Sequence, residues 1–162
     1  MGMRVVCRES ASSSEGEVLS FDFWMRGGAT PRPMHVHPRQ EERITVISGS
    51  VRSRSGGVER ILSPGDSVVS PAGEAHTVGQ AGREDVEMVA ELRRALRYEE
   101  FIERSFALDR AGHLNAKGRG NPLRMATAGA RDAEFYIARV PLGLQRAVLT
   151  VTERLARWLG YA

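Results

Sequence analysis

The chain has 162 residues, a length typical of one domain. Hydrophobic residues make up 41% of it and charged residues 27%, which excludes collagen-like, disordered and transmembrane classes of protein. The net charge is +3, and the whole excess lies in residues 98–162, where 10 basic residues are scattered among 7 acidic ones. Because no run of like charges forms, we expect no nucleic-acid partner.

Cysteine content and targeting signals indicate a cytoplasmic protein. Cys7 is the single cysteine, so no intramolecular disulfide can form. The segment Met1–Gly16 lacks the apolar run of a secretory signal. Near the other end, the weakly charged stretch Pro141–Gly160 still contains three arginines and Glu153, so it is not a membrane span. We therefore expect no membrane partner.

The first part of the chain reads as β structure. Short apolar or alternating runs are separated by turn signals such as Ser63-Pro64-Gly65-Asp66, the pattern of a sandwich or barrel. His76 begins a further candidate strand after Pro71-Ala72-Gly73. The predicted strands are Glu17–Met25, Arg43–Ile47, Val51–Ser55, Val58–Leu62, Ser67–Ser70 and Asp85–Leu92.

The pattern changes to helical after residue 97. We predict helices over Tyr98–Leu108, over Leu123–Val140 at least from Met125 to Tyr136, and over Leu142–Leu159. We expect residues 1–97 to form a β barrel and residues 98–162 a helical extension packed on it as one compact unit, because about 65 amphipathic residues could scarcely fold alone. The last helix carries an apolar stripe, which we expect to pack on the barrel or on a dimer mate: Leu144, Val148, Val151, Leu155 and Trp158.

Three of the four histidines fall within 42 residues and indicate a metal site. His35 and His37 are separated by one residue, so on a strand both imidazoles lie on one face. Glu41 and Glu42 follow and offer a carboxylate, and His76 offers a third imidazole. Three imidazoles and a carboxylate suit one divalent transition metal ion, Fe, Mn, Ni, Cu or Zn, with positions left for water or substrate.

The spacing of these residues resembles the two motifs of the cupin superfamily. The first motif, G-x5-H-x-H-x3,4-E-x6-G, is matched by His35, His37, Glu42 and Gly49, with Gly28 displaced by one residue. The second, G-x5-P-x-G-x2-H-x3-N, is matched by Gly65, Pro71, Gly73 and His76, with Gln80 in place of the final Asn. More loosely, the run from Gly65 to Phe101 and the closing helix are similar to bacterial single-cupin proteins with a helical tail and no assigned reaction.

The resemblance implies a cupin-type double-stranded β-helix, or jelly-roll, barrel with C-terminal α-helices packed on it. It also implies that His35, His37, Glu42 and His76 surround one metal ion. Simple strand parity would instead place Glu41 on the face of the two histidines, but Pro38 interrupts a regular strand. Glu41 therefore stays as the alternative ligand.

Inward positions of the barrel are expected to form the wall of a pocket for a small organic molecule, although they could equally be core. Arg43 and Arg52 are candidates to hold a carboxylate, and Tyr136 is a candidate proton donor. The loop Asp109–Pro122, with His113 and Asn115, is long enough to cap the barrel mouth. The expected wall residues are Leu19, Phe21, Phe23, Met25, Ile44, Val46, Met88 and Ala90.

Three functions fit these features. The first is a metal-dependent enzyme acting on a small organic molecule. The ligand set resembles cupin dioxygenases, with Glu42 able to leave the metal and act as a base. A Lewis-acid isomerase or cyclase is the enzymatic alternative. The second is a non-catalytic binding or sensing module, and the third a regulator whose tail binds DNA, for which no recognition-helix pattern is present. We expect a homodimer.

Overall fold

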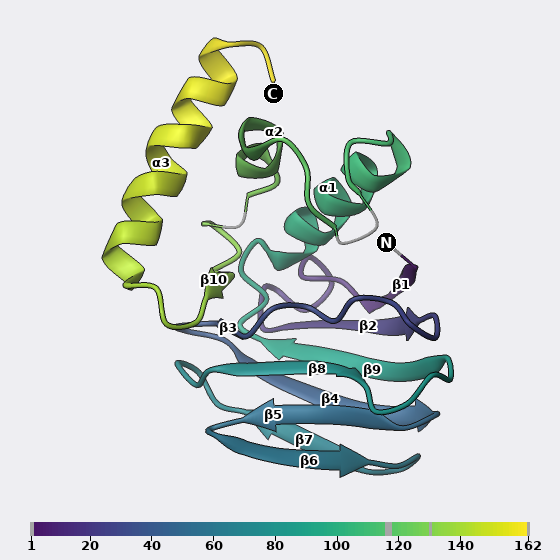
Figure 1. Cartoon of the computed structure of the whole chain (residues 1–162). Coiled ribbons are helices and arrows are strands. Elements are labelled where there is room, and N and C mark those ends of the chain that lie inside the picture. The colour runs from purple at the N-terminus through teal and green to yellow at the C-terminus, as the bar shows by residue number, and fades with distance from the viewer. Residues whose placement is uncertain (1, 116–117, 130, 162) are drawn as a thin grey trace.

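Two antiparallel β-sheets form the body of the protein. The computed structural model describes residues 2–115, 118–129 and 131–161. The first sheet contains, in spatial order, β1 (Met3–Glu9), β2 (Val18–Met25), β9 (Val86–Arg93), β4 (Glu41–Ser48) and β7 (Ser67–Ser70). The second sheet contains, in spatial order, β10 (Tyr136–Ile137), β3 (His35–Val36), β8 (His76–Gln80), β5 (Val51–Ser55) and β6 (Val58–Leu62). Figure 1 shows that helices α1 (Tyr98–Arg110), α2 (Pro122–Thr127) and α3 (Leu142–Trp158) gather at one end of these strand layers.

The core follows from alternation along the strands. In β2 every second residue is buried, from Leu19 to Met25, and β9 repeats this pattern from Val86 to Leu92. β2 and β4 both pair with β9, so the inward rows of the three strands lie side by side. The inward row of β4 is Glu42, Ile44 and Val46. The mainly β jelly-roll fold with C-terminal helices is thus confirmed, and one carboxylate faces its apolar interior.

One predicted helix is wrong. Instead of continuing from Met125 to Tyr136, α2 ends at Thr127, because Gly129 has a φ of +88° and Glu134 a φ of +55°, values an α-helix does not contain. The chain then turns back to the body, and Tyr136 pairs with Val36 of β3. Residue 130, within the predicted range, lies outside the described residues, as do residues 116 and 117 of the expected capping loop.

An additional strand, β1, was not predicted. Its burial pattern is mostly exposed because it pairs with β2 at the edge of its sheet. Polar residues such as Arg4 and Arg8 therefore interrupt the apolar pattern by which a strand is usually recognised.

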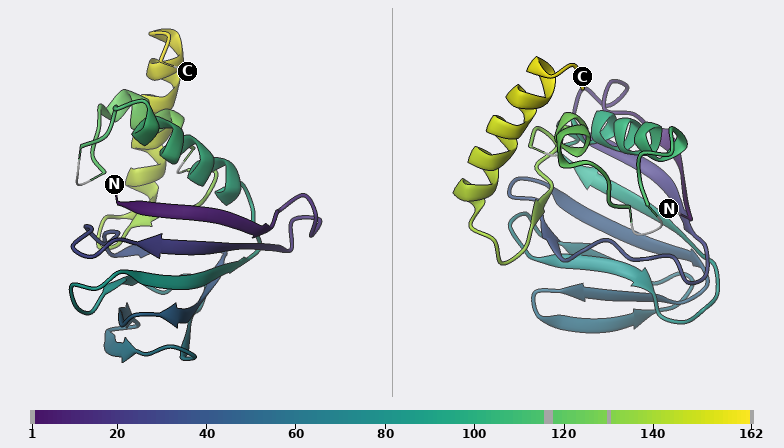
Figure 2. Two further views of the ribbon diagram at one scale, coloured as in Figure 1. Left: turned by 90° about the vertical axis from the view of Figure 1, so that its right-hand side faces the viewer. Right: turned by 45° about the horizontal axis from the view of Figure 1, so that its top comes forward.

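The last helix lies against the body through the side opposite its apolar stripe, where Ala156 is fully buried and Gln145, Leu149 and Glu153 are half-buried. The apolar stripe therefore does not pack on the barrel. Figure 2 shows α3 along the flank of the molecule, beside α2. Leu144, Val151 and Trp158 are 57%, 66% and 80% exposed. The reason is that polar groups of the opposite side bond to residues 131–137 instead, as described below. Within the described part of the chain, no helix is long and apolar enough to span a membrane.

Candidate metal centre

Three histidines and one glutamate meet inside the body of the protein. One ligand atom from each of His35, His37, Glu42 and His76 lies within 4.8 Å of those of the other three. The four residues are no more than 3% exposed. Four metal-ligating groups from three separate chain segments therefore converge on one buried point.

The two sheets position this cluster between them. His35 on β3 is the direct register partner of His76 on β8, which places two imidazoles side by side on one sheet. His37 follows β3, and its carbonyl accepts a hydrogen bond from Gly73 N at 2.8 Å. Glu42 comes from the opposite sheet, where it pairs with Ser70 and Leu92. Glu41, its neighbour, points to the other face of β4 and is outside the cluster.

Each imidazole is held by a backbone carbonyl. Nδ1 of His35 lies 2.8 Å from the carbonyl oxygen of Pro33, and Nδ1 of His76 lies 2.9 Å from that of Glu74. Nδ1 of His37 lies 3.2 Å from the carbonyl of Glu134, 97 residues away. Since a carbonyl only accepts, Nδ1 carries the proton in each ring and Nε2 is left with a lone pair. This is the arrangement usual for metal-ligating histidines.

The electrostatics of the cluster favour neutral His35 and His37 beside an ionised Glu42. Burial lowers the pKa of His35 to about 3 and that of His37 to about 4. Burial also raises the pKa of Glu42, but the hydrogen bond to His76 and the charges of the histidines outweigh it and bring the value to about 2. Burial lowers the pKa of His76, but the facing Glu42 carboxylate reverses this effect and leaves it raised.

The cluster fits a divalent transition metal ion. Among the described residues, Nε2 of His35 and Nε2 of His37 are buried without a hydrogen-bond partner. Nε2 of His76 lies 3.0 Å from Oε2 of Glu42, a separation that needs a cation or a proton between the two lone pairs. Three imidazole nitrogens and one carboxylate oxygen are donors that Fe, Mn, Ni, Cu and Zn accept. The unpartnered atoms are otherwise costly to bury.

The C-terminal extension covers the cluster with aromatic rings. Phe135 stacks on His35 with 4.5 Å between ring centroids, and Phe101 stacks on Phe135 at 5.5 Å. Tyr98 meets the edge of His37 at 5.3 Å. Two clefts, of about 550 Å³ between β1, β2 and α1 and about 630 Å³ between the helices, are lined by none of the four clustered residues. Solvent is therefore kept from the site by side chains from residues 98–137.

Replacing Phe135 with alanine is expected to open this cover. Loss of a half-buried ring between two aromatic neighbours lowers the free energy of unfolding by about 2–3 kcal/mol. It also exposes the His35 ring, whose modification by diethylpyrocarbonate in the metal-free protein then becomes faster. Urea unfolding and mass spectrometry of modified peptides measure the two effects. Ile137→Ala, nearby in the chain but 40% exposed, is the control and leaves the reactivity of His35 unchanged; equal rates in both variants contradict the assigned cover.

Tyr98 and Arg32 lie beside the cluster and were not predicted from the sequence as site residues. Tyr98 is fully buried, and its Oη accepts a hydrogen bond from Nη1 of Arg32 at 2.7 Å. Burial raises the pKa of Tyr98 to about 12, so its hydroxyl stays protonated. Tyr98 follows a turn in which Arg94 and Leu96 have positive φ, and the Gln40 side chain bonds the carbonyls of Arg94 and Ala95. This turn, which propensity does not reveal, brings α1 over the cluster.

Other candidates lie away from the cluster. Arg43 is exposed, and exposed Arg52 pairs with Glu59. Tyr136 is buried, but its hydroxyl bonds the Arg131 carbonyl at 3.1 Å. His113 is exposed and lines the helical cleft. Gln80 bonds the carbonyl of Arg26 and is not a ligand. The expected wall residues are all buried, and they form the apolar core.

Comparison with known families agrees with this geometry. Residues 23–90 match the model of the cupin domain. This is a cupin. The match includes all four clustered residues, and it ends before the helices that cover them. No curated protein matches the sequence.

Solved structures share the cupin fold. A predicted oxalate decarboxylase from Thermotoga maritima superposes with a TM-score of 0.53 at 17% identity, covering 57% of this chain and 80% of that one. A cupin-like protein from the same organism gives 0.51 at 22%, covering 57% and 68%. The cupin domain of Schizosaccharomyces pombe Cnp3 gives 0.52 at 12%, covering 69% and 72%. Identities this low show the fold alone.

Proposed function

We propose that this cupin is a metal-dependent enzyme acting on a small organic molecule, with dioxygen as the second reactant. The observation that carries the proposal is the convergence of three lone-pair Nε2 atoms and one carboxylate in a buried, aromatic setting. These residues would hold a divalent Fe or Mn ion, which would supply the redox chemistry for a reaction of dioxygen with an organic molecule. His35, His37, His76 and Glu42 are the ligands in this proposal.

The surrounding side chains define what such a molecule resembles. Phe135, Phe101 and Tyr98 offer aromatic surface, which favours an apolar or aromatic body. Arg32 and the Tyr98 hydroxyl form a polar pair beside His37, suited to a carboxylate or carbonyl oxygen. The low pKa of Glu42 favours its role as a ligand over that of a general base, which works best with a pKa near the working pH.

A non-catalytic binding or sensing cupin is the second candidate, favoured by the complete burial of the four residues. Catalysis requires the aromatic cover to move so that a substrate can reach the ion. An isomerase or cyclase would need the same movement but no oxygen.

Nitric oxide tests for open metal positions without a known substrate. We expect the anaerobic Fe(II)-loaded protein to bind nitric oxide and give the half-integer-spin electron paramagnetic resonance signal of a non-haem iron nitrosyl. Glu42→Gln should bind iron at least ~10-fold more weakly, whereas its neighbour Glu41→Gln, the matched control, should not. If the protein binds iron but the iron does not bind nitric oxide, the result contradicts the enzymatic proposal and supports the sensing one. Turnover of a candidate substrate without oxygen would instead indicate isomerase or cyclase chemistry.

A further inference from the structure

Helix α3 carries an apolar stripe that its own chain leaves in water. Its members recur at steps of 4, 3, 4 and 3 residues, the spacing of a coiled-coil seam. Between 43% and 80% of each is exposed. The stripe consists of Leu144, Val148, Val151, Leu155 and Trp158.

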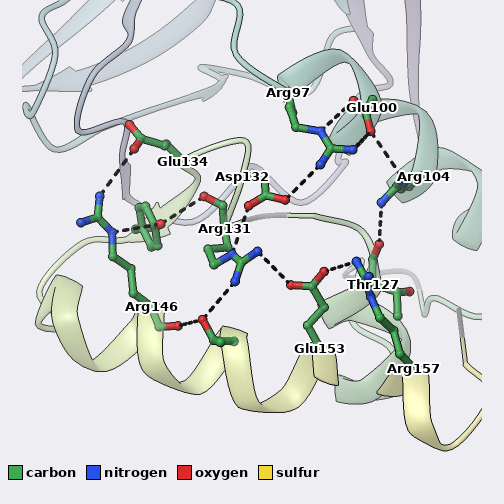
Figure 3. A network of polar contacts seen from close by, with 12 residues as sticks. Arg97, Glu100, Arg104, Thr127, Arg131, Asp132, Glu134, Arg146, Glu153 and Arg157 are labelled. Atoms are coloured by element: carbon green, nitrogen blue, oxygen red, sulfur yellow. Dashed lines mark hydrogen bonds and ion pairs between the residues drawn. The ribbon is translucent and has the colours of Figure 1, made fainter. Parts of the chain in front are cut away.

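The opposite side of α3 attaches the helix to the body through polar contacts, with buried Ala156 and half-buried Leu149 among them. Figure 3 shows Arg131 reaching Glu153, at 3.5 Å, and Arg146 reaching Glu134, also at 3.5 Å. The Gln145 side chain accepts from the backbone nitrogen of Ile137 at 2.9 Å and donates to its carbonyl at 2.8 Å. An amphipathic helix normally turns its apolar face to its own core, so α3 has the reverse orientation.

We propose that this stripe is a dimerisation surface on which α3 of a second copy packs its own stripe. The exposed fractions of the five residues and of adjacent Leu159 correspond to roughly 700 Å² of surface, close to the ~800 Å² that each partner buries in a stable interface. Val151 is the central member, with two apolar residues on either side. A two-fold axis through Val151 therefore places the stripe against itself, as an isologous dimer requires.

The charges on α3 favour a second copy over a lipid surface. A helix lying on a membrane directs its cations to lipid headgroups. Here two of the three arginines of α3 are engaged within the chain: Arg146 is directed to Glu134 of the body, and Arg157 pairs with Glu153 of α3 at 2.6 Å. The apolar stripe is also narrow, like the seam between two paired helices. A second copy covers the stripe and leaves these ion pairs in place.

Sedimentation velocity on the full chain tests the proposal. We expect a dimer at micromolar concentration, and a Kd raised roughly 100-fold or more by Val151→Glu, because a charge at the centre of each seam is desolvated in the dimer. The substituted side chain is solvent-exposed in the single chain, so its far-ultraviolet circular dichroism and urea midpoint should not change. The matched control is Ile61→Glu on edge strand β6, where Ile61 is also exposed, at 53%. This variant should stay dimeric.

Cross-linking gives an independent readout. In a Cys7→Ala background, Val151→Cys should form an intermolecular disulfide on mild oxidation, since Val151 faces its copy across the axis. A monomeric wild-type chain at 100 μM overturns the proposal. So does a dimer that Ile61→Glu disrupts and Val151→Glu does not. Flotation of the wild type with vesicles of phosphatidylcholine and phosphatidylserine, lost in Val151→Glu, would assign the stripe to a membrane instead.

Discussion

His76→Ala is expected to remove stoichiometric metal from the purified protein. His76 supplies one of three imidazoles, and its loss leaves the Glu42 carboxylate without the group 3.0 Å away. With one of the four proposed ligands removed, a divalent ion would need water as a replacement ligand, and that water would have to enter a buried aromatic pocket. We expect the metal content to fall from about one ion per chain to below ~0.1, a loss of at least ~10-fold in affinity.

Elemental analysis of protein purified without chelator measures this effect. His113→Ala is the matched control, because His113 is exposed and outside the cluster. It should retain the wild-type metal content. Wild-type content in His76→Ala would contradict the assigned centre, provided that circular dichroism shows the variant to be folded.

The metal-free protein is expected to lose stability steeply as the pH falls below about 6.5. In the native state the pKa values of His35 and His37 are about 3 and about 4, against 6.5 for an ordinary histidine. Between these values the unfolded chain binds protons that the native chain does not, so stability is present above pH 6.5 and is lost on acidification. Each histidine contributes a slope of up to about 1.4 kcal/mol per pH unit.

The other two clustered residues, His76 and Glu42, have pKa values that are shifted in opposite directions. The pKa of His76 is raised, so its contribution is present at low pH and is lost as the pH rises through its native value. Glu42, with a pKa of about 2, contributes stability above pH 4.5 that is lost only in stronger acid. The net result is a fall in stability from pH 6.5 towards pH 4, where His35 and His37 dominate.

Urea unfolding of the chelator-treated protein across pH 4–8 measures this slope. His35→Gln should reduce it by up to about half, because one of two titrating groups is gone. His113→Gln should leave it unchanged. A slope that is the same in His35→Gln as in the wild type would show that the buried imidazoles are not its origin.

The four clustered residues were accessible from the sequence because motif spacing encodes strand pairing. His35 and His76 are register partners, and the turn at Gly73, with a φ of +83°, uses the glycine that the second motif specifies and that adopts this conformation most easily. The alternation of side chains along a regular strand would alone have favoured Glu41 as the carboxylate ligand. The irregular segment between β3 and β4, where Pro38 lies, shifts the phase so that Glu42 faces inward instead.

The aromatic cover was not accessible from the sequence because it depends on long-range contacts. Residues 131–137 have apolar and helix-favouring side chains, and only Gly129 signalled that the helix ends before them. Likewise, the stripe on α3 correctly indicated an amphipathic helix. Its outward direction could not be read from periodicity, because long-range contacts hold the opposite side on the body, among them ion pairs with Arg131 and Glu134 and the burial of Ala156.

The hydrogen bond from His37 to the carbonyl of Glu134 has a consequence for how the protein is made. All four clustered residues have left the ribosome once His76 has emerged, but the carbonyl that orients His37 follows 58 residues later. A nascent chain with an open cluster therefore precedes the covered one during synthesis. The residues whose rings cover the cluster, Tyr98, Phe101 and Phe135, are all synthesised after His76. The aromatic cover over the cluster is thus the last part of the site to be synthesised.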